Sequence, residues 1–202
     1  MKLYYVPATR STRPRWLLEE LEVPYELVRL DSTAKENKQP EYLAINPTGH
    51  VPALVDDDGS AIFESLAICL HLADKFPEKG LAPPIGDPER GRYLTWSVFS
   101  MVSIEKSVDL YNKHTVRLPE PERVPSVAAT MARTFHEDAA VVEAALAGKE
   151  YLVCGRFTVA DLMMSATLGW AKLLGLLAEH PVLEEYVRRN LARPAAKRGR
   201  KD

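Results

Sequence analysis

Residues 46–77 read NPTGHVPALVDDDGSAIFESLAICLHLADKFP, and the rest of the chain is organised around them. Two short apolar runs, 51–55 and 61–63, flank the acidic turn Asp56-Asp57-Asp58-Gly59. An Asp-Gly pair between two apolar runs is a strong short-range signal for a β-hairpin. The residues after the hairpin fit an amphipathic helix that opens at Glu64-Ser65.

Pro52 lies inside the first apolar run, where a proline indicates an edge strand or a special peptide bond. A cis bond between Val51 and Pro52 would turn the main-chain N–H and C=O of Val51 out of the ladder, free to pair with an extended ligand. Ser65 at the helix start offers a hydroxyl and free N–H groups, which bind a carboxylate well. The segment therefore combines an edge for a peptide-like ligand with an anion site.

The composition is that of an ordinary soluble globular protein, with 202 residues, 46% hydrophobic and 27% charged. The net charge of −2 gives no argument for nucleic acid or for a membrane surface. We expect no signal peptide and no membrane span, because no apolar run approaches the required length. Cys69 and Cys154 lie far apart without metal-ligand spacing, so we expect no disulfide, no metal and a reducing cytoplasm.

The first part of the chain alternates strand and helix signals in the order β-α-β-α-β-β-α, which predicts a thioredoxin-like domain over residues 1–77. Residues 78–88 are rich in proline and glycine, so we expect them to be a linker without regular structure. The elements predicted before the hairpin are strands at 3–7 and 25–30, a helix at 13–21 and a helical turn at 40–44.

Residues 89–202 are predicted to form an all-helical domain, so the fold class is α/β followed by a helical bundle. Thr158 and Asp161 have the spacing of a capping box at the start of an apolar helix, the expected buried spine of this domain. From residue 192 onward we expect a solvated basic tail. The predicted helices span 89–112, 127–147, 158–177 and 181–191.

The stretch 46–77 resembles the glutathione-binding segment of the glutathione S-transferase family, whose pattern is N-P-x-G-x-V-P-x-L, a short hairpin and E-S-x-A-I. Residues 151–161, YLVCGRFTVAD, are similar to a second family signature, and Arg-Pro-Ala at 193–195 to a common ending. The start of the chain is most similar to bacterial members of the beta- and theta-like type. The resemblance implies glutathione as co-substrate, a small apolar electrophile as second substrate, and a homodimer.

The resemblance also implies which residues hold glutathione. Ser65 would bind the γ-glutamyl carboxylate and Glu64 the ammonium group, while the main chain of Val51 would pair with the cysteinyl backbone. His50 and Lys38 would face the glycyl carboxylate. The structural alternatives are that Ser65 only caps its helix and that Lys38 is merely a solvated lysine.

The partner of the thiolate departs from the family pattern. Bacterial members with Y-Y-x-P-x-x-C-S carry a cysteine where this chain has Arg10, and a histidine in the long helix where it has Glu105. We rank Ser11 first, Thr9 second and Tyr5 third as groups that could stabilise the thiolate, with Ser11 as a mere N-cap as the alternative. Arg10 could instead act by its charge or form an ion pair with Glu105.

The acceptor site is expected along the long helix, at Trp96, Phe99, Ser103 and Glu105, whose aromatic content suggests an apolar electrophile. The resemblance thus implies a glutathione transferase acting in detoxification. One alternative is a glutathione-dependent disulfide or peroxide reductase on the same fold. The other is a non-catalytic interaction protein, favoured by the departures at positions 10 and 105 and opposed by the retained Val51-Pro52 and Glu64-Ser65.

Overall fold

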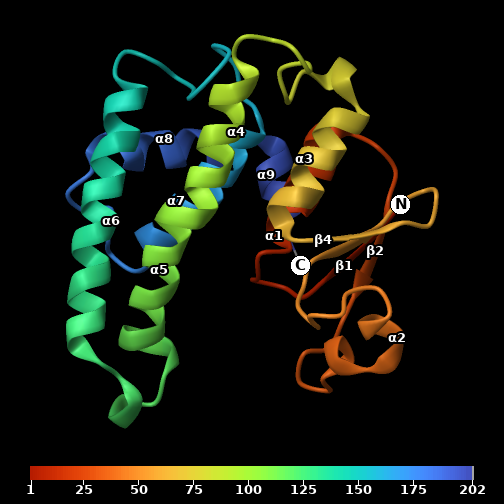
Figure 1. Ribbon diagram of the computed structural model, residues 1–202, viewed down its shortest axis with the longest axis horizontal. Helices are drawn as coiled ribbons and strands as arrows, with labels where there is room; N and C mark the ends of the chain where they lie inside the picture. The colour runs from red at the N-terminus through yellow and green to blue at the C-terminus, as the bar shows by residue number, and fades with distance from the viewer. Residues whose placement is uncertain (202) are drawn as a thin grey trace. The chain divides into compact units, whose positions relative to one another are not determined.

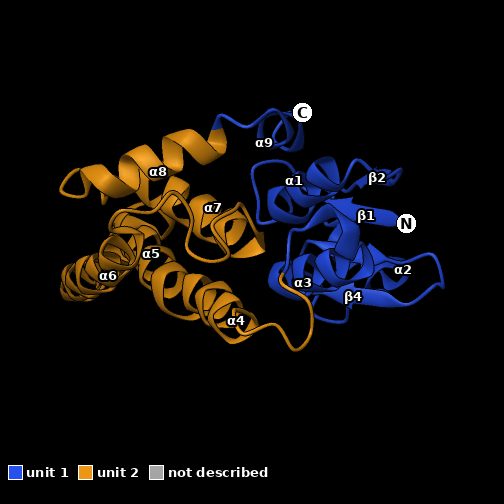
Figure 2. Ribbon diagram, turned by 90° about the horizontal axis from the view of Figure 1, so that it is seen from above, with its two compact units in different colours: residues 1–82, 192–202 blue, residues 83–191 orange. Residues whose placement is uncertain are grey.

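The computed structural model describes residues 1–201, which form two compact units (Figure 2). One unit contains residues 1–82 together with the residues from 192 onward, and the other contains residues 83–191. The first unit combines a sheet with helices, whereas the second is entirely helical. This is the fold class that the sequence predicts.

The first unit is built on a four-stranded sheet with the strand order β2-β1-β3-β4 (Figure 1). Strands β1 (Lys2–Tyr5) and β2 (Glu26–Arg29) are parallel and are connected by helix α1 (Thr12–Leu21), since parallel neighbours need a crossover. Strand β3 (Ala53–Val55) is antiparallel to β1 and forms the predicted hairpin with β4 (Ala61–Phe63). The arrangement is thioredoxin-like.

Helix α3 (Ser65–Lys75) follows β4 directly and begins at the predicted residue. Two short helical segments, a 3-10 turn at Glu36–Lys38 and α2 (Pro40–Leu43), precede the hairpin. The stretch expected to lack regular structure contains one 3-10 turn at Pro77–Lys79. The core of the unit consists of fully buried side chains of β1, α1, β3 and α3, among them Leu3, Trp16, Leu17, Leu54, Ile68 and Leu72.

The residues after 192 are not the solvated tail that the sequence suggests. They form α9 (Pro194–Gly199), which packs on α1 (Figure 1). The approach is so close that a Cβ on Gly199 would lie 2.6 Å from the Cα of Trp16. The basic side chains find acidic partners on α1, as in the pair of Arg193 Nε with Glu20 Oε1 at 2.6 Å. Long-range ion pairing of this kind leaves no local signal in the sequence.

The second unit contains four main helical stretches joined by short connections. The helix predicted at 89–112 is interrupted by a π-helical turn, in which one extra residue per turn shifts the side chains that follow. The elements are α4 (Arg90–Phe99), a π turn (Ser100–Ile104), α5 (Glu105–Asn112), a π turn (Lys113–Arg117), a 3-10 turn (Glu120–Glu122), α6 (Pro125–Leu146), α7 (Val159–Leu173) and α8 (Pro181–Leu191).

Helix α7 is the buried spine of the second unit, and its predicted capping box is present. The Oδ2 atom of Asp161 accepts hydrogen bonds from the N–H and the hydroxyl of Thr158, both at 3.0 Å. Its Oδ1 atom accepts from the N–H of Leu152 and the hydroxyl of Tyr186, both at 2.9 Å. Burial raises the pKa of the Asp161 carboxyl, although these donors act in the opposite direction. None of the described helices is both long and apolar enough to span a membrane.

Candidate functional site

The N-terminus of α3 carries a concentration of positive potential. Ser65 is 3% exposed, and the N–H groups of the first helical turn have no partner within the helix. Arg13, in the first turn of α1, is also 3% exposed, and its Nη1 donates a hydrogen bond to Ser65 Oγ at 3.3 Å. A buried guanidinium therefore lies beside the predicted carboxylate site. Sequence reasoning missed Arg13, because no local pattern separates it from a solvated arginine.

Glu64 precedes this helix in an unusual backbone conformation. Its φ is +71°, a region that a side chain other than glycine rarely adopts, and its side chain is exposed. Such a conformation costs on the order of 1–3 kcal/mol and clusters at functional sites. The carboxylate of Glu64 is thus presented at the same helix start as Ser65.

The predicted cis bond between Val51 and Pro52 is present, and the ladder of β3 begins only at Ala53. Among residues 1–201, neither the main-chain N–H nor the C=O of Val51 has a hydrogen-bond partner. The preceding loop is held by Asn46, whose Nδ2 donates to the C=O of His50 at 2.7 Å. The Val51 edge is therefore fixed in place and open.

The hairpin register brings the Val51 edge and the α3 start to the same end. Ala53 pairs with Phe63, so Val51 and Ser65 each lie two residues beyond this pair, at the open end of the hairpin. Neighbouring strands are separated by roughly 5 Å. The predicted peptide-like edge and the predicted anion site thus lie at the same end of the hairpin.

Lys38 and His50 flank the loop that leads to this edge, and both side chains are exposed. Lys38 Nζ donates to the C=O of Thr48 at 3.2 Å, and the side-chain amide of Asn37 donates to the C=O of Gly49 at 2.7 Å. Gly49 has a φ of +62°, and a Cβ there would lie 2.6 Å from Lys38 Nζ. Only glycine permits this approach of the lysine to the loop.

The hydroxyls of Thr9 and Ser11 form a chain at the start of α1. Thr9 Oγ1 donates to the C=O of Val6 at 2.7 Å, and Ser11 Oγ lies 2.9 Å from Thr9 Oγ1. Because the only proton of the Thr9 hydroxyl is committed to Val6, Ser11 must be the donor within the pair. Ser11 is 1% exposed and occupies the N-cap position of α1, but its side chain makes no capping hydrogen bond.

The other thiolate candidates differ in accessibility. Tyr5 is part of the core of the first unit, with the Arg15 guanidinium 5.4 Å from its ring centroid. Arg10 is exposed, in the turn that follows Ala8 with its φ of +54°. Of these two side chains, that of Arg10 is therefore the more exposed.

Both cysteines are free, and neither is activated. Burial raises the pKa of the Cys69 thiol to about 12, although the charge of Arg13 acts in the opposite direction. Burial also raises the pKa of Cys154. Over residues 1–201 no group of three or more histidine, cysteine or acidic side chains is arranged to hold a metal ion. Any reactive thiol at the site must therefore be brought by a ligand.

The predicted acceptor residues lie on the second unit. Trp96 and Phe99 of α4 pack edge to face with ring centroids 5.7 Å apart, and both remain partly exposed. Ser103, also partly exposed, belongs to the π turn that follows. Glu105 is 5% exposed, and its Oε2 accepts a hydrogen bond from the hydroxyl of Thr167 at 3.5 Å. Glu105 thus differs from the other three by being enclosed.

Comparison with known proteins identifies the family. The sequence model of "Glutathione S-transferase, N-terminal domain" matches residues 1–74, and that of "Glutathione S-transferase, C-terminal domain" matches residues 125–189. Glutathione S-transferase GstA of Escherichia coli O157:H7 is 34% identical over 183 residues, with 89% of this chain and 86% of that protein covered. The chain belongs to the glutathione S-transferase family.

Other relatives of this transferase extend the comparison. A solved sphingomonad glutathione S-transferase, complexed with glutathione, is 30% identical, has a TM-score of 0.86, and is matched over 99% of this chain and 97% of that one. The disulfide-bond oxidoreductase YfcG of Escherichia coli strain K12 is 26% identical over 202 residues, with 96% and 91% covered. The similarity to named transferases over most of the chain makes the protein a glutathione transferase of the bacterial type.

Proposed function

We propose that this transferase binds glutathione along the open end of the hairpin and that the bound thiolate attacks a small apolar electrophile. The observation that carries the proposal is the open main chain of Val51 opposite the start of α3. An extended tripeptide would pair its cysteinyl backbone with Val51 and place its γ-glutamyl end at Ser65. Lys38 and His50 would face the glycyl carboxylate.

The hydrogen bond from Arg13 leaves the hydroxyl of Ser65 free to act as a donor. Because Arg13 donates to Ser65 Oγ, the proton of this hydroxyl is left for another acceptor. A carboxylate at the helix N-terminus would accept it together with the main-chain N–H groups. The exposed carboxylate of Glu64 would pair with the ammonium group of the same γ-glutamyl end.

Retention on immobilised glutathione, followed by calorimetric titration, tests this site. We expect Ser65→Ala to weaken glutathione binding about tenfold, since a hydrogen bond to a charged group contributes about 1.5–3 kcal/mol. Ser60→Ala, in the exposed hairpin turn, is the matched control and should bind as the wild type does. Equal affinity of wild type and Ser65→Ala would refute the site, and a wild type that is not retained would favour the non-catalytic interaction protein.

For the thiolate, the burial pattern favours charge over a hydroxyl. A free thiol has a pKa of about 8.5, and a cation within a few ångströms lowers the pKa by about one unit or more. Ser11 is buried with its proton directed at Thr9, whereas Arg10 is exposed. We therefore assign the stabilisation of the glutathione thiolate to Arg10. Ser11 is the second candidate for this role, ahead of Thr9 and Tyr5.

Ultraviolet titration of the bound thiol distinguishes these candidates. With glutathione bound, Arg10→Ala should raise the thiol pKa by about one unit, whereas Ser11→Ala should leave it in place. A shift in Ser11→Ala alone would transfer the role to the hydroxyl. If neither variant shifts the thiol pKa, both assignments fail, while the binding site tested through Ser65 is unaffected.

The acceptor is proposed to be a small apolar electrophile received by Trp96, Phe99 and Ser103, with Glu105 enclosed beside them. Aromatic side chains supply large apolar contact area, which suits a chloronitroaromatic acceptor. Conjugation to such an acceptor should fall at least about tenfold in Trp96→Ala, with the change mainly in KM. Conversion of electrophiles of this kind in the cytoplasm would serve detoxification, and the two free cysteines fit a reducing compartment.

A disulfide reductase is the second candidate, favoured by the similarity to YfcG. Since both protein thiols are unactivated, glutathione would have to supply both electrons. One glutathione thiolate attacks a disulfide and releases one thiol, and a second glutathione then releases the other thiol and forms glutathione disulfide. Turnover of a mixed disulfide faster than conjugation of a chloronitroaromatic acceptor would select this reaction.

We also propose that the transferase is a homodimer. An exposed apolar stripe runs along α4 into the π turn, with Leu94, Val98 and Val102 exposed by 37%, 45% and 63%. Apolar side chains at four-residue spacing lie on one helix face and favour burial against a partner. Val98→Glu should shift the mass in light scattering from dimer to monomer, and an unchanged mass would exclude this face.

A further inference from the structure

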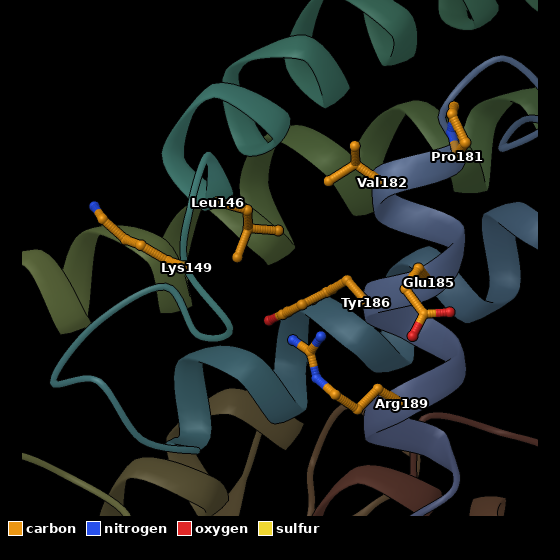
Figure 3. A pocket seen from close by; sticks show the side chains of 7 residues that line it. All are labelled: Leu146, Lys149, Pro181, Val182, Glu185, Tyr186 and Arg189. Atoms are coloured by element: carbon orange, nitrogen blue, oxygen red, sulfur yellow. The ribbon is translucent and has the colours of Figure 1, made fainter.

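We propose that a pocket in the helical unit binds a small apolar monocarboxylate (Figure 3). The pocket has a volume of about 370 Å³ and is formed by the end of α6, the loop after it and one side of α8. All of its residues belong to the second unit, so the inference does not depend on the proposed glutathione site. The lining residues are Leu146, Lys149, Pro181, Val182, Glu185, Tyr186 and Arg189.

The body of the pocket is apolar. Leu146 and Tyr186 form its buried part, while Val182 is 50% exposed and stands nearer to solvent. The hydroxyl of Tyr186 is already bound to Asp161, so the ring rather than the hydroxyl faces a ligand. A volume at the lower end of small-molecule sites suits a compact apolar group.

Arg189 supplies a fixed and incompletely satisfied cation in this pocket. Its guanidinium lies over the rings of Tyr151 and Tyr186, 5.6 and 5.8 Å from their centroids. Its Nη2 donates to the C=O of Glu150. The Nε atom is buried without a hydrogen-bond partner, and no carboxylate of the described residues lies within ion-pair distance of this guanidinium. A guanidinium has five N–H donors, so Arg189 keeps donors for a further acceptor in the pocket.

The neighbouring charges limit the acceptor to a single negative charge. Glu185 projects from α8 beside Arg189 (Figure 3). It is held by Arg188 through two hydrogen bonds of 2.7 Å. A second negative charge on the ligand would be repelled by Glu185. The ammonium of Lys149 points away from Arg189 at the rim (Figure 3), so of the two cations among the described lining residues Arg189 is the one that faces the pocket. A planar carboxylate fits the guanidinium fork best.

Methyl NMR of the full chain, with glutathione present throughout, tests the site directly. Phenylbutyrate should shift the methyl signals of Leu146 and Val182 in the millimolar range or below. Its neutral isostere phenylbutyramide should bind about tenfold more weakly, because it cannot form a charge-assisted hydrogen bond. Equal binding of acid and amide, or no shift of these two methyl groups, would overturn the proposal.

Three variants separate the anchor from general charge. Arg189→Gln should weaken phenylbutyrate binding about tenfold or more. Lys149→Gln removes the same charge from the rim and should change the affinity by less than about threefold, which makes it the matched control. Val182→Trp, at a half-exposed position, should fill the pocket and abolish the methyl shift of Leu146. If Arg189→Gln does not fold, the amide comparison and Val182→Trp still decide; unchanged binding in Val182→Trp refutes the site.

Discussion

Replacing Asp161 by asparagine tests how far one carboxylate holds the helical unit together. The carboxylate accepts four hydrogen bonds, two from main-chain N–H groups and two from hydroxyls, and the residue is 0% exposed. Asparagine keeps the shape but replaces one acceptor oxygen with a donor. Hydroxyls can rotate away, but at least one N–H, of Leu152 or Thr158, would lose its acceptor. An unsatisfied buried donor costs about 1–3 kcal/mol.

We therefore expect Asp161→Asn to lower the free energy of unfolding by about 2–3 kcal/mol, because the lost charge also weakens the remaining bonds. In urea, with a slope of about 2 kcal/mol per molar, the midpoint should fall by about 1 M at equal protein concentration. Glu137→Gln, which removes an exposed carboxylate on α6, is the control and should stay within about 0.5 kcal/mol of wild type. Asp161→Asn at the wild-type midpoint would refute the reasoning.

Three further predictions follow from single contacts. Burial opposes ionisation of Asp56, but the hydrogen bonds that it accepts, led by that from Lys75, lower its pKa to about 2. This contribution to stability is present above a pH of about 4 and is lost as the pH falls toward 2, so Asp56→Asn should be less stable than wild type by on the order of 1 kcal/mol at neutral pH. Urea midpoints of wild type and variant that do not converge as the pH falls from 5 to 3 would contradict this prediction. Arg13→Met should weaken glutathione binding about tenfold in calorimetry, because Ser65 then loses its orienting donor; an unchanged affinity would remove Arg13 from the site. Gly199→Ala should lower stability by about 1–3 kcal/mol, since its Cβ would collide with the main chain of α1, whereas Gly91→Ala, with open space around it, should lower it in neither urea nor heat.

The local geometry of the hairpin and of the start of α3 was predictable from sequence because its signals are local. Pro52 within an apolar run predicted the cis bond. The Asp-Gly turn predicted the hairpin, whose register brings Val51 opposite Ser65. The capping box of Thr158 and Asp161 was equally readable, since both members lie within one helical turn.

What the sequence did not reveal depends on distant partners. Arg13 is buried because α3, some fifty residues later, supplies Ser65 as its acceptor. The π turn at Ser100–Ile104 has no composition of its own that distinguishes it from the flanking α-helix. Residues after 192 read as a solvated tail, because their acidic partners such as Glu20 lie at the opposite end of the sequence. Position 10 carried no matching family pattern, so the reaction remained less defined than the binding.

The return of α9 to α1 makes the first unit discontinuous: the whole of residues 83–191 is inserted between two pieces that pack as one body. During synthesis, the helical unit can therefore complete its core while the sheet unit still lacks its final helix. A protease cut or a truncation before residue 192 would remove a packing element from the unit that carries Val51 and Ser65. Loss of residues at the C-terminal end of the chain would thus affect the candidate site formed by residues nearer its N-terminal end.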